Sequence, residues 1–325
     1  MGTAFGQKND TIRLFNGDRV VGEIKDLELG LLRVKTDHMG ELFIEWDQVA
    51  SFRSTKQWDL RTRSGMHLIG YVVPSPLMDH QYILSGQDSI HIARLNIVQF
   101  TRVQKGLWAR MDGSISLGFS YQQANNLVQI TAGASVSYTY RKGSIHLSGN
   151  SISSEQKDVS DNIKQDLSFS WDRNLRGRWV AGVGVGAERN TELGLDLRQK
   201  GNIYGGNLLI QTTHTNDLLS GGVQQNREDN QAGISTDNTE VFLNNRLRIR
   251  TYKFPKTDIT IDLYGYYGLT IADRFRAQAD IKLRYEVVKD LFLGLEFYDQ
   301  YDSRPLDGGP ALNDYRISTT ASYTF

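Results

Sequence analysis

A chain of 325 residues with 37 basic and 37 acidic side chains has no excess of positive charge with which to bind nucleic acid. It contains no cysteine, which excludes disulfides, thiol catalysis and cysteine-ligated metals. No apolar run approaches the roughly 18 residues that a membrane-spanning helix needs. Any segment that crosses a membrane must therefore be a strand, in which only every second residue has to be apolar.

The first seven residues, 1–7, are too short for a secretory signal. The segment Ala4-Phe5-Gly6 is nevertheless similar to the small-residue end of such a signal. We expect residues 1–7 to be the remnant of an export signal or to be disordered.

Residues 8–105 contain an internal repeat, which appears when the sequence is shifted by 48 positions against itself. The shift aligns Gly17 with Gly65 and Phe52 with Phe100. In the first copy, Asn16-Gly17-Asp18 lies between two alternating segments, which favours a hairpin with a type I′ turn. We expect Gly17 and Gly65 to have positive φ. The pattern predicts a small duplicated β domain of the SH3-like or Sm-like kind.

From residue 106 to residue 325 the sequence changes to about a dozen segments in which apolar and polar residues alternate. In one of them, Ala277, Ala279, Ile281 and Leu283 alternate with charged or amide side chains. The contrast is too sharp for the core of a β-sandwich, but it is typical of strands with lipid on one face and a hydrated lumen on the other. We therefore predict an antiparallel transmembrane β-barrel of about 12 strands.

The connections between these segments broadly alternate in length, as they do in outer-membrane barrels, with brief outer links around Asn125 and Asp273 as the exceptions. Short connections lie near residues 141–143, 175–177, 214–216, 255–257 and 288–290, and longer polar ones near 153–164, 188–201, 226–239 and 302–314. This order places the short turns and residues 8–105 in the periplasm. Ten aromatic residues near the short turns are expected to form a periplasmic girdle: Tyr138, Tyr140, Trp171, Trp179, Tyr252, Phe254, Tyr285, Phe292, Tyr323 and Phe325.

The chain ends on Phe325, two residues after Tyr323, which resembles the C-terminal signal that barrel-assembly machinery recognises. Residues 14–25, 30–37 and 43–47 resemble the N-terminal module of a family of salt-induced outer-membrane proteins of Gram-negative bacteria. The resemblance is specific over these segments and architectural over the barrel. It implies the fold and a place in the outer membrane, but no activity, because the family is a domain of unknown function.

Charged residues on the predicted lumen face are the main candidates for a functional site. Six basic residues could form a ladder for anionic solutes: Arg246, Arg248, Arg250, Arg276, Lys282 and Arg284. The alternative is an internal ion network that fills a narrow lumen, in which they pair with Asp262, Asp280, Glu286 and Glu296. The six histidines have no metal-ligand spacing and we find no catalytic motif, so we expect neither a metal, nor a cofactor, nor an enzyme.

Two functions remain open at this stage. The first is a narrow solute channel with a periplasmic plug or docking module. The second is a closed scaffold whose N-terminal domain binds another envelope protein or the cell wall, with Trp46 as an interface candidate, although tryptophan is more often found in a core. The expected partners are outer-membrane lipid, the barrel-assembly machinery and such an envelope protein, and nucleic acid is not among them.

Overall fold

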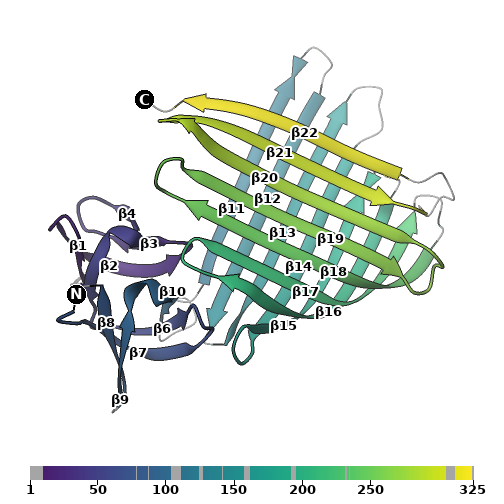
Figure 1. Ribbon diagram of the computed structural model, residues 1–325. Helices are drawn as coiled ribbons and strands as arrows, with labels where there is room; N and C mark the ends of the chain where they lie inside the picture. Colours follow the sequence, from purple (N-terminus) through teal and green to yellow (C-terminus); the bar gives the residue numbers. More distant parts are fainter. Residues whose placement is uncertain are drawn as a thin grey trace, which may run out of the picture.

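A computed structural model describes residues 10–77, 79–86, 88–103, 111–123, 127–140, 142–156, 162–191, 195–230, 233, 235–304 and 312–323. These residues form two antiparallel sheets and two short 3₁₀ helices, so the predicted all-β class is confirmed (Figure 1). None of the helices within this part of the chain is long and apolar enough to cross a membrane.

The N-terminal sheet has ten strands in the order β4-β3-β2-β10-β6-β7-β8-β9, and β1 pairs with both β2 and β5. The strands are β1 (Asp10–Leu14), β2 (Arg19–Glu28), β3 (Leu31–Lys35), β4 (Glu41–Glu45), β5 (Val49–Arg53), β6 (Gln57–Thr62), β7 (His67–Pro74), β8 (His80–Ser85), β9 (Asp88–Ala93) and β10 (Ile97–Arg102).

The sequence repeat corresponds to two copies of one structural unit. Each copy has four strands, a 3₁₀ helix and a fifth strand, and the helices η1 (Trp46–Gln48) and η2 (Arg94–Asn96) occupy equivalent places. Equivalent residues also contact one another. The rings of Phe52 and Phe100 stack with centroids 5.3 Å apart, and Nε1 of Trp46 donates to the carbonyl oxygen of Arg94 at 3.3 Å. The two copies therefore share one core instead of folding around two.

Trp46 lies in this shared core and is fully buried. It packs edge-on against Phe52 and Phe100, and the guanidinium of Arg94 lies over its ring. The interpretation of Trp46 as an interface residue is therefore wrong. The reason is its position in η1, which directs the indole inward to close the first repeat against the second.

The predicted turn at Asn16-Gly17-Asp18 is present, but its type differs. Gly17 has a φ of +93° and Gly65 a φ of +81°, as expected. Asn16 does not have the positive φ that a type I′ turn requires of its first central residue. Instead, the Gly17 amide donates to Leu14 and the Leu14 amide to Asp18, as in a three-residue loop with a bulge at glycine. The Asn16 side chain accepts the Asp18 amide at 3.0 Å and stabilises the loop.

The second sheet has 12 strands, the predicted number, and each pairs with its neighbours in the chain from β11 to β22. The strands are β11 (Met111–Gln122), β12 (Leu127–Tyr140), β13 (Gly143–Gln156), β14 (Asn162–Asn174), β15 (Trp179–Asn190), β16 (Leu195–Gln211), β17 (Thr215–Asn230), β18 (Ser235–Thr251), β19 (Thr257–Gly268), β20 (Phe275–Val288), β21 (Leu291–Asp302) and β22 (Leu312–Tyr323).

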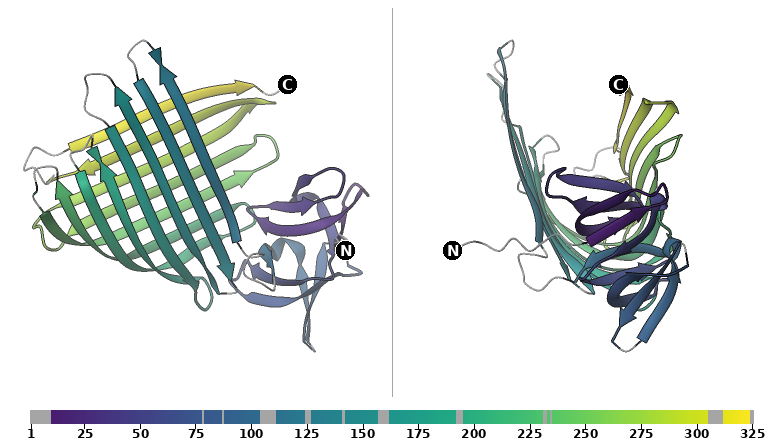
Figure 2. Two further views of the ribbon diagram at one scale, coloured as in Figure 1. Left: turned by 180° about the vertical axis from the view of Figure 1, so that it is seen from behind. Right: turned by 90° about the vertical axis from the view of Figure 1, so that its left-hand side faces the viewer.

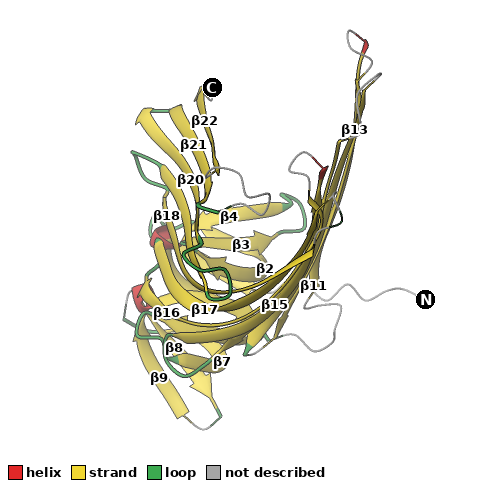
Figure 3. Cartoon of the chain, turned by 90° about the vertical axis from the view of Figure 1, so that its right-hand side faces the viewer, coloured by secondary structure: helices red, strands yellow, loops and turns green. Residues whose placement is uncertain are grey.

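This sheet curves into a deep trough, with β11 and β22 at its two rims (Figure 3). Within the described residues β11 and β22 do not pair with each other, so the ladder ends at these two strands. Apolar side chains on the convex face are exposed, among them Leu117 at 82%, Val185 at 57% and Leu243 at 59%. Alternate residues of a strand point to opposite sides of the sheet. The polar residues that alternate with these apolar ones therefore lie on the concave face.

Three of the predicted long loops are shorter than expected. β13 and β14 leave only residues 157–161 between them, where the sequence predicted a loop near 153–164. β15 and β16 leave only residues 191–194 between them, and β17 and β18 leave only 231–234. The ladder continues through the segments assigned to loops and pairs Asn226 with Asn238. The prediction for 188–201 and 226–239 was wrong because polar residues occupy both faces of these strand ends, so that alternation disappears although the backbone pairing does not.

Glu23 on β2 holds the N-terminal domain together by contacts with three cations. Its carboxylate lies 2.8 Å from Lys25 Nζ, 3.2 Å from Lys56 Nζ and 2.7 Å from an Arg102 nitrogen. Burial alone would raise the pKa of Glu23, but hydrogen bonds and charges from Lys25 and Lys56 outweigh it and lower the pKa from 4.5 to about 2. Arg102 belongs to the last strand of the second repeat, so the cluster joins the two copies.

We expect Glu23 to make the N-terminal domain sensitive to acid. A carboxyl group whose pKa is lower in the folded state stabilises the fold above its unfolded pKa of 4.5, and this stabilisation is lost as the pH falls towards about 2. Glu23→Gln should lower the urea midpoint at pH 7 and narrow its difference from wild type between pH 4.5 and 2. Fluorescence of the buried Trp46 and Trp58 would follow unfolding. A constant difference at every pH would contradict this role.

Candidate functional site

The N-terminal domain lies across one opening of the trough, at the end where the short turns are (Figure 2). His214, in the turn between β16 and β17, makes the central contact. Its Nε2 lies 3.2 Å from an Asp47 carboxylate oxygen, and Lys253 Nζ lies 3.8 Å from the same oxygen. The ring of His214 rests against Gly30, where a Cβ would come within 2.9 Å of it. Gly30 therefore allows the close approach, at a φ of +78°.

Two further hydrogen bonds fix the orientation of the domain. The Tyr252 hydroxyl donates to the carbonyl oxygen of Leu29 at 2.8 Å, from the turn after β18. Arg178, from the turn before β15, donates to the carbonyl oxygen of Arg63 at 2.6 Å. The contacts come from three turns and reach both repeats, so the domain is held at several points instead of hanging from its connection.

A partly open cavity of about 890 Å³ lies between the domain and the concave face of the sheet. Its lining includes Asp59, Arg61, His67 and Gln99 from the N-terminal domain. The sheet contributes side chains from β12 to β19, including Tyr204, Arg246, Arg248 and Tyr264. The domain is thus part of the wall of this cavity.

Three of the six predicted basic residues are neutralised by carboxylates. Arg246 Nε lies 2.7 Å from Asp262, as the predicted ion network requires. The other two pairs were not predicted: Arg250 lies 2.8 Å from Asp258, and Arg276 pairs with Glu240 while its guanidinium lies over the Tyr266 ring. These pairs argue against a continuous ladder of free positive charge.

The other three basic residues differ from one another. Arg284 lies over the ring of Phe292, with 4.1 Å between its guanidinium carbon and the ring centroid. Lys282 stands opposite Glu296 in the β20–β21 register. Arg248 lines the cavity and, among the described residues, has no carboxylate within ion-pair distance.

The remaining predicted acidic partners take different contacts. Asp280 accepts a hydrogen bond from Gln278 at 2.9 Å and stands opposite Asp262 in the register. Glu286 is buried and accepts the backbone amides of Lys256 and Asp290, each at 2.9 Å. Glu286 therefore holds two turns in place, and its expected role as partner of a lumen arginine is not what the structure shows.

A buried polar network that the sequence did not predict lies at the end of the trough away from the N-terminal domain. Glu228 and Glu240 are 1% and 0% exposed. Glu228 lies 3.0 Å from Arg198 and 4.0 Å from Arg274, and Arg274 in turn lies 2.6 Å from Asp302. Both glutamates fall in or next to a segment read as a loop. One feature of the sequence could have indicated a strand here: every second residue from Asn238 to Arg246 is polar, except Phe242.

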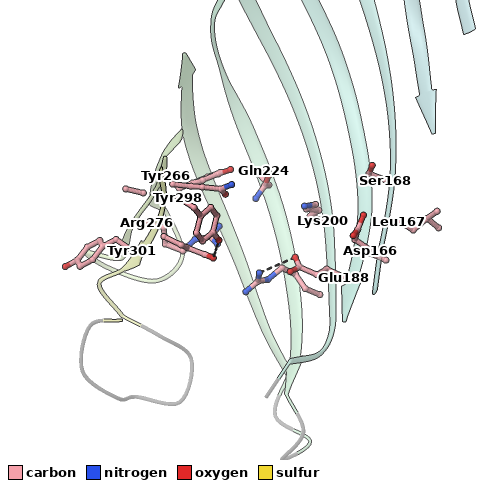
Figure 4. A pocket seen from close by; sticks show the side chains of 15 residues that line it. Asp166, Leu167, Ser168, Glu188, Lys200, Gln224, Tyr266, Arg276, Tyr298 and Tyr301 are labelled. Atoms are coloured by element: carbon pink, nitrogen blue, oxygen red, sulfur yellow. Dashed lines mark hydrogen bonds and ion pairs between the residues drawn. The ribbon is translucent and has the colours of Figure 1, made fainter. Parts of the chain in front are cut away.

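A second, smaller cavity of about 350 Å³ adjoins this network. Figure 4 shows Tyr298, Tyr266 and Arg276 on one wall and Gln224, Lys200 and Glu188 on the other, while Leu167 and Tyr301 point away from the enclosed space. The concave face thus surrounds a polar interior on both sides. Within the described residues, no group of three or more His, Asp or Glu side chains is placed to hold a metal ion.

The wall opposite the charged strands is lined by small hydroxyl side chains. Ser114 and Ser135 lie 2.8 Å apart, and Ser148 and Ser168 lie 2.7 Å apart. These pairs satisfy each other across β11 to β14 and carry no charge. Carboxylates of β14 and β15 also line the cavities, namely Asp166, Asp172 and Glu188, so negative charge reaches this wall, while the lining arginines of the sheet lie on β16 to β20.

The predicted aromatic girdle and assembly signal are only partly visible. Trp171 Nε1 donates to the Tyr140 hydroxyl at 2.6 Å, next to the short turn that follows β12. Phe292 is 7% exposed and packs under Lys256 and Arg284, so it is not part of an outward girdle. Tyr323 ends β22, and Phe325 lies outside the described residues, so the assembly signal stays a prediction.

A family model described as "Protein of unknown function, DUF481" matches residues 115–325. No curated protein matches the chain. Among solved structures, one described as "NanC porin structure in rhombohedral crystal form" is similar at 12% identity with a TM-score of 0.34, covering 65% of this chain and 100% of the other. The resemblance to salt-induced outer-membrane proteins stays a prediction, because the family description names no such role.

We expect Asp47→Asn to loosen the docked domain. The carboxylate is about a third exposed, so its contacts with His214 and Lys253 are worth roughly 0.2–1 kcal/mol. Hydrogen exchange of the turns at 212–214 and 252–256 should therefore rise by roughly 1.5- to 5-fold. Asp88→Asn, an exposed carboxylate on β9, is the control and should change nothing. Equal exchange in both variants would show that Asp47 does not hold the domain.

Proposed function

Since the chain belongs to the DUF481 family, whose function is unknown, we propose its role from its geometry: a non-enzymatic outer-membrane β-barrel that forms a narrow solute channel, with its N-terminal domain as a periplasmic plug. The observation that carries the proposal is the 890 Å³ cavity, whose wall is built jointly by the N-terminal domain and the polar face of the sheet. The sheet contacts outer-membrane lipid, and the barrel-assembly machinery inserts it.

The convex face supports placement in a membrane. One row of residues paired straight across neighbouring strands is apolar on every strand from β12 to β20. A soluble sheet would cover such a surface with a second layer, whereas lipid covers it in a barrel. The row consists of Tyr138, Ile145, Trp171, Val183, Ile203, Val223, Val241, Tyr267 and Phe275.

Closure of the sheet follows from the same placement. An unpaired strand edge in hydrocarbon leaves backbone amides and carbonyls without partners, at several kcal/mol each. With 12 antiparallel strands, β11 and β22 run in opposite directions and can pair with each other. Paired residues in the ladder always share a face, as Phe297 and Ile317 do on the convex side. The outward residues of β22 must therefore pair with the outward residues of β11.

A scaffold function is the second candidate, and one observation favours it. The N-terminal sheet ends in β4 on one side and β9 on the other, and neither strand has an outer neighbour among the described residues. Open edges of this kind accept an added strand from a partner protein. Another envelope protein bound there would make the domain a docking module.

The first experiment tests closure by cysteine cross-linking, for which the cysteine-free chain is a clean background. Ile317→Cys on β22 should cross-link within one molecule to a cysteine at an outward position of β11, namely Ile115, Leu117, Phe119 or Tyr121. Cysteines at the inward positions Gly118 and Ser120 are the controls and should not react. Cross-links that form only between two molecules would contradict a closed monomeric barrel.

The second experiment tests the plug by single-channel recording in planar bilayers. The wild type should conduct weakly, because the docked domain occupies the mouth. Gly30→Ala with Asp47→Asn removes the two features that allow the His214 contact, and the conductance should rise by about twofold or more. Asp88→Asn is again the control. Recordings that stay at background in every variant would overturn the channel and favour the scaffold.

A further inference from the structure

We propose that the seam between the N-terminal domain and the sheet is a binding site for a small solute carrying phosphate or carboxylate groups, held by Arg61 and Gln99 of the domain and by Arg248 and Asn216 of the sheet. The proposal rests on the proposed function, because it names the class of solute that such a channel would take. Of the six basic residues predicted to bind anionic solutes, only Arg248 belongs to this site.

The seam is a defined space to which both parts of the chain contribute. A pocket of about 110 Å³ is lined by Gln99 from the N-terminal domain and by Asn216 and Arg248 from the sheet. All three residues also line the 890 Å³ cavity, together with Arg61. Gln99 and Arg61 are neighbours across the β10–β6 ladder, and Arg248 and Asn216 are neighbours across the β17–β18 ladder.

No ion pair joins Arg61 or Arg248 to a carboxylate in the described part of the chain. Arg246, Arg250 and Arg276 each pair with a carboxylate, whereas Arg248 has none within ion-pair distance among the described residues. Asp59 lies two residues before Arg61 on β6 and is the carboxylate whose charge acts on Arg61. Burial lowers the pKa of Arg61 and outweighs the opposing charge of Asp59, which also lies 3.6 Å from His67.

A guanidinium in such a setting needs an oxyanion or water as a partner, because a desolvated charge without one is costly. Its paired N–H groups match the two oxygens of a carboxylate or phosphate. The amide nitrogens of Gln99 and Asn216 are additional neutral donors beside the two cations. The combination favours an anion with several oxygens over a neutral solute.

Three carboxylates also line the 890 Å³ cavity and set the limits of the site. Asp172, on β14, accepts a hydrogen bond from the Tyr204 hydroxyl. Asp59 lies beside Arg61 and His67, as described. Glu28 lines the seam itself, and no ion pair joins it to Arg248 in the described part of the chain. Glu28 would repel a bound anion, so its removal should strengthen binding.

The test is calorimetric titration of the detergent-solubilised full chain with inorganic phosphate and, separately, with citrate, each up to about 10 mM. Wild type should bind at least one of them, and the one it prefers identifies the phosphate or carboxylate source. Arg61→Gln and Arg248→Gln should each weaken binding by about tenfold or more, since each removes charged hydrogen bonds. Glu28→Gln should bind more tightly than wild type.

Two variants separate this site from general effects. Lys282→Gln removes a cation from the same concave face outside the cavity lining, and it should bind as wild type does. Arg248→Lys keeps the charge and should retain more affinity than Arg248→Gln, which a merely misfolded barrel would not show. Absence of binding in wild type, or equal binding in all variants, would overturn the site. Binding without conductance would leave the site standing and overturn only the channel.

Discussion

The continuous backbone ladder from β11 to β22 is the constraint on which the rest of the structure depends. It fixes which side of every strand faces outward, because each residue is paired with one that shares its face. Apolar residues on the convex side and polar residues on the concave side then follow from the register alone. The ladder also leaves two strand edges, and in lipid these edges must pair with each other.

Three arginines on the concave face are neutralised individually, each by its own carboxylate. They are Arg246, Arg250 and Arg276. Only the pair of Arg276 and Glu240 is well buried, and removing one member of such a pair typically costs about 3–5 kcal/mol. Such pairs shape the interior but offer little free charge to a solute. Arg61 and Arg248, where the N-terminal domain meets the sheet, have no such partner in the described part of the chain, so in the proposed channel the docked domain would both narrow the mouth and supply the anion-selective position.

The class of the fold, the number of strands in the large sheet and the duplicated unit were predictable, because each depends on a local pattern: alternation, turn residues and a fixed offset of 48 positions. The ends of the strands were not, since alternation vanishes where both faces meet water, as at Asn226. Pairing of charges was predictable only across adjacent strands, as for Arg246 and Asp262. The contact of Arg276 with Glu240 spans two strands, and its geometry depends on curvature that no single segment encodes.

The contacts between His214, Gly30 and Asp47 could not have been predicted either, because they join turns more than 160 positions apart in the chain. They show that the short turns have a second role besides connecting strands. The same turns that reverse the chain present His214, Tyr252 and Arg178 to the N-terminal domain. The domain is therefore positioned by the barrel, which explains how a small β unit can line a cavity inside it.

The most direct test of a lipid-covered sheet around an aqueous interior is a cysteine scan along β18, from Val241 to Arg250, in outer-membrane vesicles. A water-soluble maleimide should label the even positions, including Arg246 and Arg248, and miss the odd ones, while a lipid-soluble reagent should show the reverse. That period of two follows from the pairing of β18 with β17 and β19. Uniform labelling along the strand would contradict the account.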